Sequence, residues 1–374
     1  MIELNWRIGV EIELIAPQGR SRSDLAEEIA WAFGGTVRRF FHPQSEPSKV
    51  QDSPIFQNLT LGFEVLDPEG CLIAQCVDDL TLQEDLDPNH PPQPGWYRIV
   101  SDDSRLLKLV ERQADPAASL AEVLTPIAQL FGTQTEFGPG GMVRVDDDSG
   151  ASIAIAAPLP GERERPCELI TPPIDTDHQE RLESLLKVAR SLGFTAPIEG
   201  ATHLHFDASP LCSSHALANL INLLWTHGAN LRKLVGTNPR CRRLGAWHKS
   251  LYEVVQSPDF QMLPWEEATQ HLKSVELTKY CDFNIMNFIH ATEHKHTFEA
   301  RIFPVWLNAQ PILEATGLIE AILKRAVKPE KVPSLPPQSW SKATVKTFLN
   351  ELPMSEELRQ VWQTRLAALA ETAT

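Results

Sequence analysis

Near the start of the chain, apolar side chains alternate with other residues over positions 8–15, IGVEIELI. This period of two is typical of a half-buried strand, because successive side chains of a strand point to opposite faces. We therefore predict a strand that places Glu11 and Glu13 together on the face opposite the core. Neighbouring carboxylates on one face repel each other unless solvent, a cation or a basic partner neutralises them. The strand is either a solvated edge strand or half of a metal site.

Three later segments show the same alternation with other polar groups. Residues 202–207, 297–303 and 167–171 each place polar side chains on one face and apolar side chains on the other. The polar residues are His203, His205 and Asp207 in the first segment, Glu299 and Arg301 in the second, and Glu168 in the third. Pro172 and Pro173 end the last of these strands. If the four strands pair in one sheet, one of its faces suits a divalent metal and phosphate better than water.

Apolar residues at helical spacing predict a layer of helices that covers the other face of this sheet. The predicted helices span residues 23–33, 106–131, 178–192, 213–235 and 312–327, with one or two more after the proline-rich stretch 329–337. The first has Ser23 or Asp24 as its N-cap and Gly34-Gly35 as its stop. The second is interrupted at Asp115-Pro116.

Further strands and turns follow from shorter patterns. Residues 59–75 predict a hairpin that turns at 67–70, and residues 142–145 form a plausible strand. Residues 283–291 and 297–303 predict a second hairpin, joined by the polar turn 292–296. We expect one domain over residues 1–374, in which residues 41–140 are an inserted subdomain and residues 329–374 a helical tail.

Charge and composition narrow the functional classes. The net charge of −15 argues against a nucleic-acid partner, which usually requires a basic stripe. No run approaches the roughly 20 apolar residues that span a bilayer, and no signal-like segment opens the chain, so we expect a cytoplasmic protein without a membrane partner. The six cysteines are scattered without zinc-site spacing. The run Arg163-Glu164-Arg165 is typical of a solvated charge run, although it could reach the site.

The four charged segments, in this order, resemble the putative amidoligase family, the carboxylate-amine ligases built like glutamine synthetase and glutamate-cysteine ligase. Two weaker landmarks also fit, residues 238–243 (NPRCRR) and Lys279-Tyr280 leading into Phe283-Asn284-Ile285. The resemblance implies an α+β fold with an antiparallel sheet of the glutamine synthetase-like catalytic type. It also implies that ATP and Mg²⁺, with two ions expected and Mn²⁺ as a substitute, support amide formation through an acyl-phosphate. The partners would be small-molecule or peptide carboxylates and amines.

Residue roles carry over from the family by position. The resemblance assigns Glu11 and Glu13 to the metals, with Glu168 completing one metal site and His203 and Glu299 the other. It places Arg301 on the transferring phosphate and His205 near nucleotide or substrate, so that Arg301, Glu299 and His205 are the expected catalytic residues. Arg240 or Arg243 would hold phosphate or a substrate carboxylate, where a guanidinium offers a bidentate fork.

One departure from the family pattern leaves a choice open. Family members usually carry an Asp-x-Ser strand before the Glu168 motif, and this chain offers Asp102-Asp103-Ser104 and Asp147-Asp148-Ser149. The second lies closer to Glu168, so we favour Asp147 as an extra metal carboxylate, although it could equally be part of a turn. Two other functions remain open, a phosphotransferase resembling guanidino kinases on the same fold and a non-catalytic binding protein.

Overall fold

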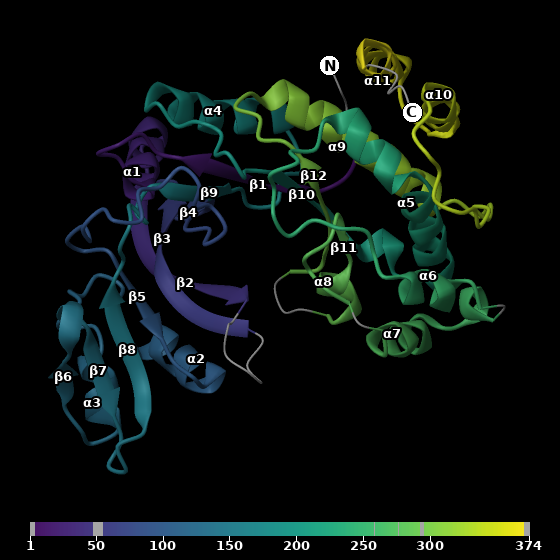
Figure 1. Ribbon diagram of the computed structural model, residues 1–374. Coiled ribbons are helices and arrows are strands. Elements are labelled where there is room, and N and C mark those ends of the chain that lie inside the picture. Colours follow the sequence, from purple (N-terminus) through teal and green to yellow (C-terminus); the bar gives the residue numbers. More distant parts are fainter. Residues whose placement is uncertain (1–3, 48–54, 258, 276, 292–294, 370–374) are drawn as a thin grey trace. The chain divides into compact units, whose positions relative to one another are not determined.

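The computed structural model describes residues 4–47, 55–257, 259–275, 277–291 and 295–369 (Figure 1). Its contacts divide the chain into two compact units, which we treat separately. Unit 1 comprises residues 1–12, 173–186 and 200–374, and unit 2 comprises residues 13–172 and 187–199. Eleven α-helices lie in the described part of the chain, together with antiparallel strands in both units. The mixed α and β class is therefore confirmed, whereas the glutamine synthetase-like type and the inserted subdomain stay predictions.

The sheet of unit 1 consists of the charged strands predicted from the period of two. β1 (Ile8–Ile15), which continues into unit 2, pairs antiparallel with β10 (Thr202–Asp207), and β10 pairs with β12 (Thr297–Phe303). The short strand β11 (Phe283–Asn284) extends the sheet on the far side of β12. The apolar residues of β10 and β12, such as Leu204, Phe206 and Phe298, are fully buried. The face of β10 and β12 that carries these residues therefore packs in the core.

Helices provide the rest of that core in unit 1. The two longest, α5 (Ser214–Val235) and α9 (Ala309–Ala326), lie side by side, and α5 also packs against β12 (Figure 1). α4 (His178–Ser191) begins in this unit, and α10 (Lys342–Glu351) and α11 (Glu356–Ala368) pack on each other near the C-terminus. Three shorter helices complete the set in the described residues, α6 (Lys249–Val255), α7 (Trp265–Lys273) and α8 (Met286–Ile289).

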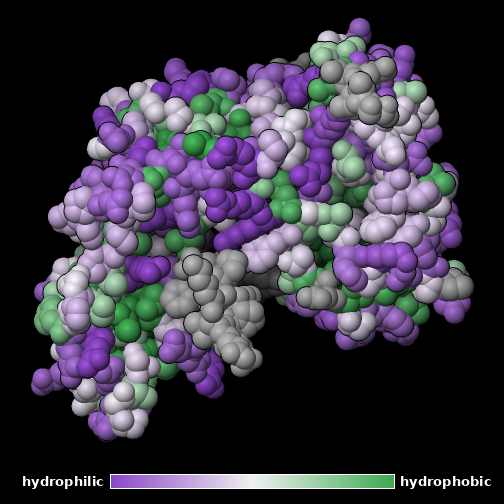
Figure 2. Space-filling model, viewed as in Figure 1, coloured by the Kyte–Doolittle hydropathy of each residue, from purple (hydrophilic) through white to green (hydrophobic). Residues whose placement is uncertain are grey.

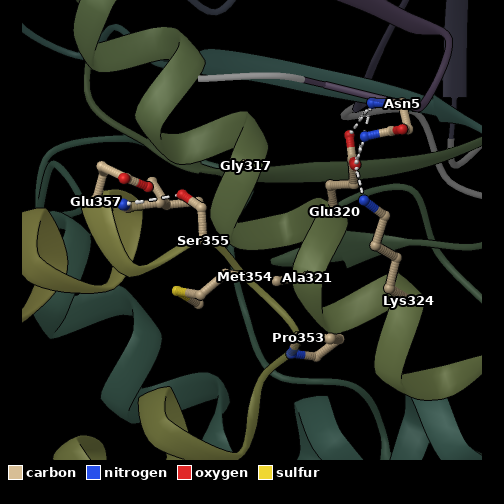
Figure 3. Close-up of a pocket in the computed structure, with 10 residues that line it drawn as sticks. Asn5, Gly317, Glu320, Ala321, Lys324, Pro353, Met354, Ser355 and Glu357 are labelled. Atoms are coloured by element: carbon tan, nitrogen blue, oxygen red, sulfur yellow. Dashed lines mark hydrogen bonds and ion pairs between the residues drawn. The ribbon is translucent and has the colours of Figure 1, made fainter. Parts of the chain in front are cut away.

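A buried glutamate ties the start of the chain to α9. Glu320 is 3% exposed, and its carboxylate accepts hydrogen bonds from the backbone amides of Asn5 and Trp6 at 3.0–3.2 Å. Lys324, one turn later, pairs with the same carboxylate at 2.5 Å. A pocket of about 580 Å³ lies beside this cluster, between α9 and residues 353–358 (Figure 3). Because Glu320 is already fully engaged, we interpret it as an anchor for the segment that leads into β1.

Unit 2 is built around β3, a strand with three partners. Along its whole length β3 (Ile55–Leu66) pairs with β2 (Thr36–Pro47), and its other edge is shared by β4 (Leu72–Val77) and β5 (Tyr97–Val100). The strands that continue from β4 and β5 are β9 (Pro166–Ile170), β8 (Ser152–Pro158), β7 (Val143–Asp146) and β6 (Thr135–Phe137). The helices of this unit are α1 (Arg22–Phe33), α2 (Ser104–Gln113) and α3 (Thr125–Leu130).

The structure confirms most predicted elements and corrects four details. The first helix starts earlier than predicted, because Ser21 rather than Ser23 or Asp24 is the N-cap and forms a capping box with Asp24. The helical stretch 106–131 is two separate helices, since α2 ends before Asp115-Pro116 and turns precede α3. The run Arg163-Glu164-Arg165 is not solvated, because each of its residues is only 9% exposed.

The predicted strand over residues 283–291 is the fourth correction. Only Phe283–Asn284 is extended, and α8 follows at once. The side chain of Asn284 accepts a hydrogen bond from the amide of Met286 at 2.9 Å, which turns the backbone away from the sheet. Residues 292–294 of the predicted turn lie outside the described residues.

Packing of the C-terminal helices gives a stability prediction for unit 1. Trp362 of α11 is fully buried, and its Nε1 donates to the carbonyl of Glu314 in α9 at 3.2 Å. We expect Trp362→Ala to lower the free energy of unfolding by about 3–5 kcal/mol, because it leaves a large cavity in the core. Urea denaturation followed by circular dichroism measures this change. Met262, which is 84% exposed in the same unit, provides the control: Met262→Ala should change stability by about 0.5 kcal/mol or less.

Candidate active site

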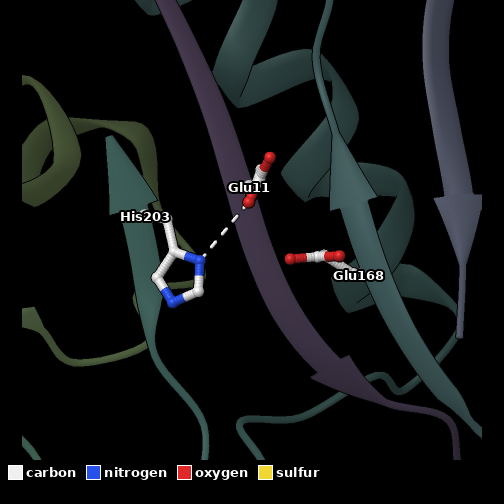
Figure 4. Close-up of side chains that lie close together, drawn as sticks. All are labelled: Glu11, Glu168 and His203. Carbon is white, nitrogen blue, oxygen red and sulfur yellow. Dashed lines mark hydrogen bonds and ion pairs between the residues drawn. The ribbon is translucent and has the colours of Figure 1, made fainter. Parts of the chain in front are cut away.

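Three neighbouring strands bring four predicted site residues together on the polar face of the sheet in unit 1. In the antiparallel register Glu11 of β1 lies opposite His203 of β10, and His205 lies opposite Glu299 of β12. Directly opposed residues of antiparallel strands point to the same face. His203 and Glu11 approach within 3.4 Å (Figure 4). All four side chains are buried, with exposed fractions of 9% or less.

The shortest approaches converge on the two carboxylates. His205 Nε2 lies 3.0 Å from Glu11 Oε1 and 4.0 Å from Glu299 Oε1. His203 Nδ1 lies 3.6 Å from the same Glu299 oxygen. One ligand atom each from Glu11, His205 and Glu299 falls within 4.8 Å of the other two, which is the spacing of a metal-binding group. The family resemblance places His205 near nucleotide or substrate. In unit 1, however, its Nε2 lies close to the carboxylates of Glu11 and Glu299.

Cations and an amide hold these carboxylates in place. Arg301 Nη1 pairs with Glu299 Oε1 at 2.7 Å in a salt bridge between two residues of the same strand. Asn284 of β11 donates to the other oxygen of Glu299 at 2.8 Å. Lys295 Nζ lies 3.0 Å from Glu11 Oε1. Each carboxylate is therefore oriented by at least one donor from a neighbouring element.

A local irregularity of β12 accompanies this arrangement. The register with β10 shifts between Thr202 and Leu204, so that two residues of β12, Arg301 and Ile302, lie opposite the single residue His203. Such a bulge adds a residue to one strand and changes the direction of nearby side chains. The backbone amide of Arg301 donates to the carbonyl of Asp282 instead of β10, at 2.9 Å. The bulge is thus located at the arginine that contacts Glu299.

The charges of this cluster shift its pKa values. Burial raises the pKa of Glu299, but the charges of Arg301 and His205 outweigh it and lower the value to about 2. Burial likewise opposes ionisation of Glu11, yet His205 and Lys295 hold its pKa well below the ordinary range. The pKa of His203 is lowered by burial and by Arg301. At neutral pH the site therefore presents two carboxylates beside a neutral His203 imidazole, a state that is ready to bind a cation.

Three predicted metal ligands belong to unit 2. Glu13 lies on the last part of β1 and is 4% exposed. Glu168, also labelled in Figure 4, lies on β9 opposite Val77 of β4. Asp147 occupies the turn after β7, where its Oδ1 accepts hydrogen bonds from Ser149 and Ala151 at 2.6–2.9 Å. It joins no group of three metal-type ligand atoms among the described residues, so the geometry favours the turn interpretation for Asp147.

The basic residues of the site region include two to which the sequence assigns no role. Arg243 stacks over the ring of Tyr280 at 5.0 Å, whereas Arg240 is exposed on the preceding loop. Lys279 is one of the two basic residues without an assigned role. Its burial, together with the charges of Arg243 and Arg301, lowers the pKa of its ammonium group. Lys295, which contacts Glu11, is the second. In the sequence, the only indication of a role for Lys295 is its position in a polar stretch two residues before β12.

Comparison with known proteins identifies one family. Residues 4–323 match the model of a family described as putative amidoligase enzyme. The chain belongs to this amidoligase family. Membership supports an enzyme of the ligase type, and the matched range contains every site residue described above. No curated protein and no solved structure matches the chain.

The surface adds one observation. Hydrophilic residues make up much of the face shown in Figure 2. In the described part of the chain, no helix is both long enough and apolar enough to cross a membrane.

The charge balance of the amidoligase site gives a pH prediction. Because the pKa of Glu299 lies near 2, below its ordinary value of 4.5, this carboxyl stabilises the fold above pH 4.5 and loses that contribution as the pH falls toward 2. We expect Arg301→Leu to raise the pKa of both Glu299 and His203, since the cation that lowers each is removed. Titration of side-chain carbon-13 shifts by NMR measures both groups. Arg325→Leu, near the end of α9, should leave them unchanged; an unshifted Glu299 in Arg301→Leu would contradict the electrostatic account.

Proposed function

We propose that this protein is an ATP- and Mg²⁺-dependent carboxylate-amine ligase that forms an amide bond through an acyl-phosphate. The observation that carries the proposal is the buried group of Glu11, His205 and Glu299, whose ligand atoms lie within 4.8 Å of one another. Family membership supports the ligase class. Substrate phosphate and metal would be bound where the carboxylates otherwise repel each other.

The donor set fits a divalent cation with a preference for oxygen ligands. Mg²⁺ takes carboxylates and water at roughly 2.0–2.1 Å. Carboxylate and water ligands suit Mn²⁺ as well as Mg²⁺, so Glu11 and Glu299 fit either ion. When bound, the metal would neutralise charge on phosphate oxygens. The family resemblance implies a second ion, with Glu13 and Glu168 among its ligands.

The basic residues of the site would act on the phosphates. In the proposed reaction a carboxylate oxygen of one substrate attacks the γ-phosphorus of ATP, and ADP leaves. The amine nitrogen then attacks the acyl carbon, expels inorganic phosphate and loses a proton. Arg301 Nη1 lies 2.7 Å from Glu299 Oε1, so its positive charge would lie close to a phosphoryl group held beside that carboxylate. Lys279 and Arg243 add positive charge to the same region.

The burial of the cluster argues against a non-catalytic binding protein that retains this site without using it. Removing charged groups from water is costly unless they are paired, and Glu11 and Glu299 are both charged and buried beside each other. A chain with no use for the cluster would gain stability from apolar residues here. The guanidino-kinase-like phosphotransferase would use the same residues, so the products of the reaction separate it from the ligase.

Two conservative variants test the metal-phosphate role. We expect Glu11→Gln and Glu299→Gln each to reduce metal-dependent ATP turnover by at least about a hundredfold, because each removes an anionic ligand while keeping the side-chain shape. ADP release in the presence of Mg²⁺ or Mn²⁺, with a panel of candidate acids and amines, measures turnover. Glu253→Gln, on the exposed face of α6, is the matched control and should keep wild-type activity. Undiminished turnover in Glu11→Gln would remove the metal-site interpretation.

Phosphorus NMR of the same reactions separates the two enzyme classes. A ligase produces ADP, inorganic phosphate and a new amide, whereas a phosphotransferase leaves a phosphorylated acceptor. Accumulation of a stable phosphorylated acceptor without free phosphate would contradict the proposed ligase.

A further inference from the structure

A cavity of about 190 Å³ lies within unit 1, between α5 and the loop that precedes α6. Three aromatic side chains contribute to its wall, those of Trp225, Trp247 and Phe283. Ala229 and Ala246 also line it and are exposed, so a ligand can enter from solvent. The volume is below the roughly 300–1,000 Å³ of pockets for drug-sized ligands. It suits a single ring or a fused pair of rings.

The aromatic rings of the wall are held in fixed orientations. Trp225 stacks on Tyr252 of α6, with ring centroids 4.7 Å apart and planes 13° apart. Trp247 Nε1 donates to the backbone carbonyl of Phe283 at 2.6 Å. The ring of Phe283 stacks on Phe298 of β12 at 6.3 Å. Because these rings are already ordered, a planar aromatic ligand would bind without the cost of ordering the wall.

An ion pair supplies the polar part of the lining. Arg232 Nη1 pairs with Asp282 at 3.2 Å, and the same carboxylate accepts from the backbone amide of Gly245 at 3.0 Å. Nε and Nη2 of Arg232 donate to no other group among the described residues. The arginine side chain keeps 36% of its accessible surface, whereas that of Asp282 keeps 8%. The pair therefore carries no net charge, and the exposed part of the arginine still has donors to offer.

A glycine of α5 keeps space open in this cavity. Gly228 lies one turn before Arg232, on the same side of the helix. A Cβ atom at position 228 would lie 3.6 Å from Phe283 Cε2, which is an ordinary van der Waals distance. Glycine inside a helix is unfavourable relative to alanine, and the φ of Gly228 is not in the left-handed region. The local feature that glycine preserves here is therefore the open space beside the helix.

The sheet separates this cavity from the carboxylates of the candidate active site. Phe283 lies on the core face of β11, where it stacks on Phe298. Asn284, the next residue, donates to Glu299 on the polar face at 2.8 Å. Successive side chains of a strand point to opposite faces. A ligand in the cavity would therefore contact the strand that holds Glu299 from behind, without reaching Glu299 itself.

We propose that this cavity binds a neutral, planar heteroaromatic molecule that carries a carbonyl oxygen, with Arg232 as the hydrogen-bond donor. The stacked rings fit a flat apolar body, and the guanidinium fits a single acceptor at its edge. Asp282 already balances the charge of Arg232, so the ligand needs no charge of its own. Its contact with Phe283, next to Asn284, is the position of an effector rather than of a substrate. The inference does not depend on the proposed ligase activity.

Isothermal titration calorimetry with the full-length protein tests the inference. The probe is indole-3-carboxamide, a neutral fused ring with a carbonyl oxygen. Indole lacks the carbonyl, indole-3-carboxylate is an anion and tryptamine is a cation. We expect the carboxamide to bind at millimolar concentration or below, and indole to bind about tenfold more weakly because a hydrogen bond to a charged donor is lost. Both charged compounds should bind at least about tenfold more weakly, since the lining offers them no unbalanced counter-charge.

Two variants assign the binding to this cavity. Arg232→Gln should weaken the carboxamide about tenfold and leave the affinity for indole unchanged. Lys233→Gln is the matched control, because Lys233 is the next basic residue of α5 and lies over the ring of Trp340, outside the lining. Gly228→Leu should abolish binding of both compounds by filling the cavity. Leucine favours a helix, so this variant keeps the test decisive if Arg232→Gln fails to fold.

Ala367→Leu, at an exposed position of α11, is the control for the added side chain and should bind as the wild type does. Glu299→Gln should also bind normally, which separates this inference from the proposed reaction. Unchanged carboxamide affinity in a folded Gly228→Leu variant would overturn the proposal. So would the absence of carboxamide binding at millimolar concentration, which would make the cavity a packing defect. Tighter binding of the carboxylate or of tryptamine would likewise contradict a neutral ligand.

Discussion

The repulsion between two buried carboxylates, Glu11 and Glu299, is the constraint on which the structure of unit 1 depends. Two anions withdrawn from water in one small region are unfavourable unless cations and donors surround them. Arg301, Lys295 and the amide of Asn284 meet that requirement at 2.7–3.0 Å. As a result, the pKa of Glu299 is lowered to about 2, and both carboxylates stay charged at neutral pH. This ionised cluster is the observation on which the proposed divalent-cation site rests.

The architecture of the sheet follows from placing these groups side by side. The antiparallel register of β1, β10 and β12 aligns Glu11 with His203 and His205 with Glu299. On the opposite face the apolar residues of these strands belong to the core, where α5 packs against β12, so the strands cannot slip without burying the charged set in that core. The short β11 adds Asn284, and the turn into α8 begins at the same residue. The alternation of polar and apolar residues along these strands therefore determines both where the site lies and which side chains pack in the core.

That alternation explains how much could be predicted from the sequence. A period of two identifies strands and the residues that share a face, so Glu11, His203, His205 and Glu299 could each be assigned to the polar face of its own strand. Strand neighbours and register depend on contacts distant in sequence, and therefore Lys295 could not be assigned to Glu11. The strand predicted beyond Asn284 was wrong because one side-chain hydrogen bond to the amide of Met286 redirected the backbone.

The sequence pattern also could not predict which charged residues are buried. The run Arg163-Glu164-Arg165 has the composition of a solvated loop, yet the arginines are engaged by carbonyls and carboxylates, several of which come from distant segments. Glu164 is left beside a cavity as a consequence. Charge counts along a chain do not reveal this burial, because it arises only when the loop is packed against α1.

Anomalous diffraction from crystals soaked with Mn²⁺ tests the central claim most directly. The account predicts an anomalous peak about 2.0–2.3 Å from a carboxylate oxygen of Glu11 and of Glu299 and from a nitrogen of His205, with Lys295 displaced from Glu11. The peak should be lost in Glu299→Gln crystals. Fully loaded crystals with no peak among these three residues, or with Lys295 still paired to Glu11 beside manganese bound elsewhere, would contradict the claim that the buried carboxylates form a metal site.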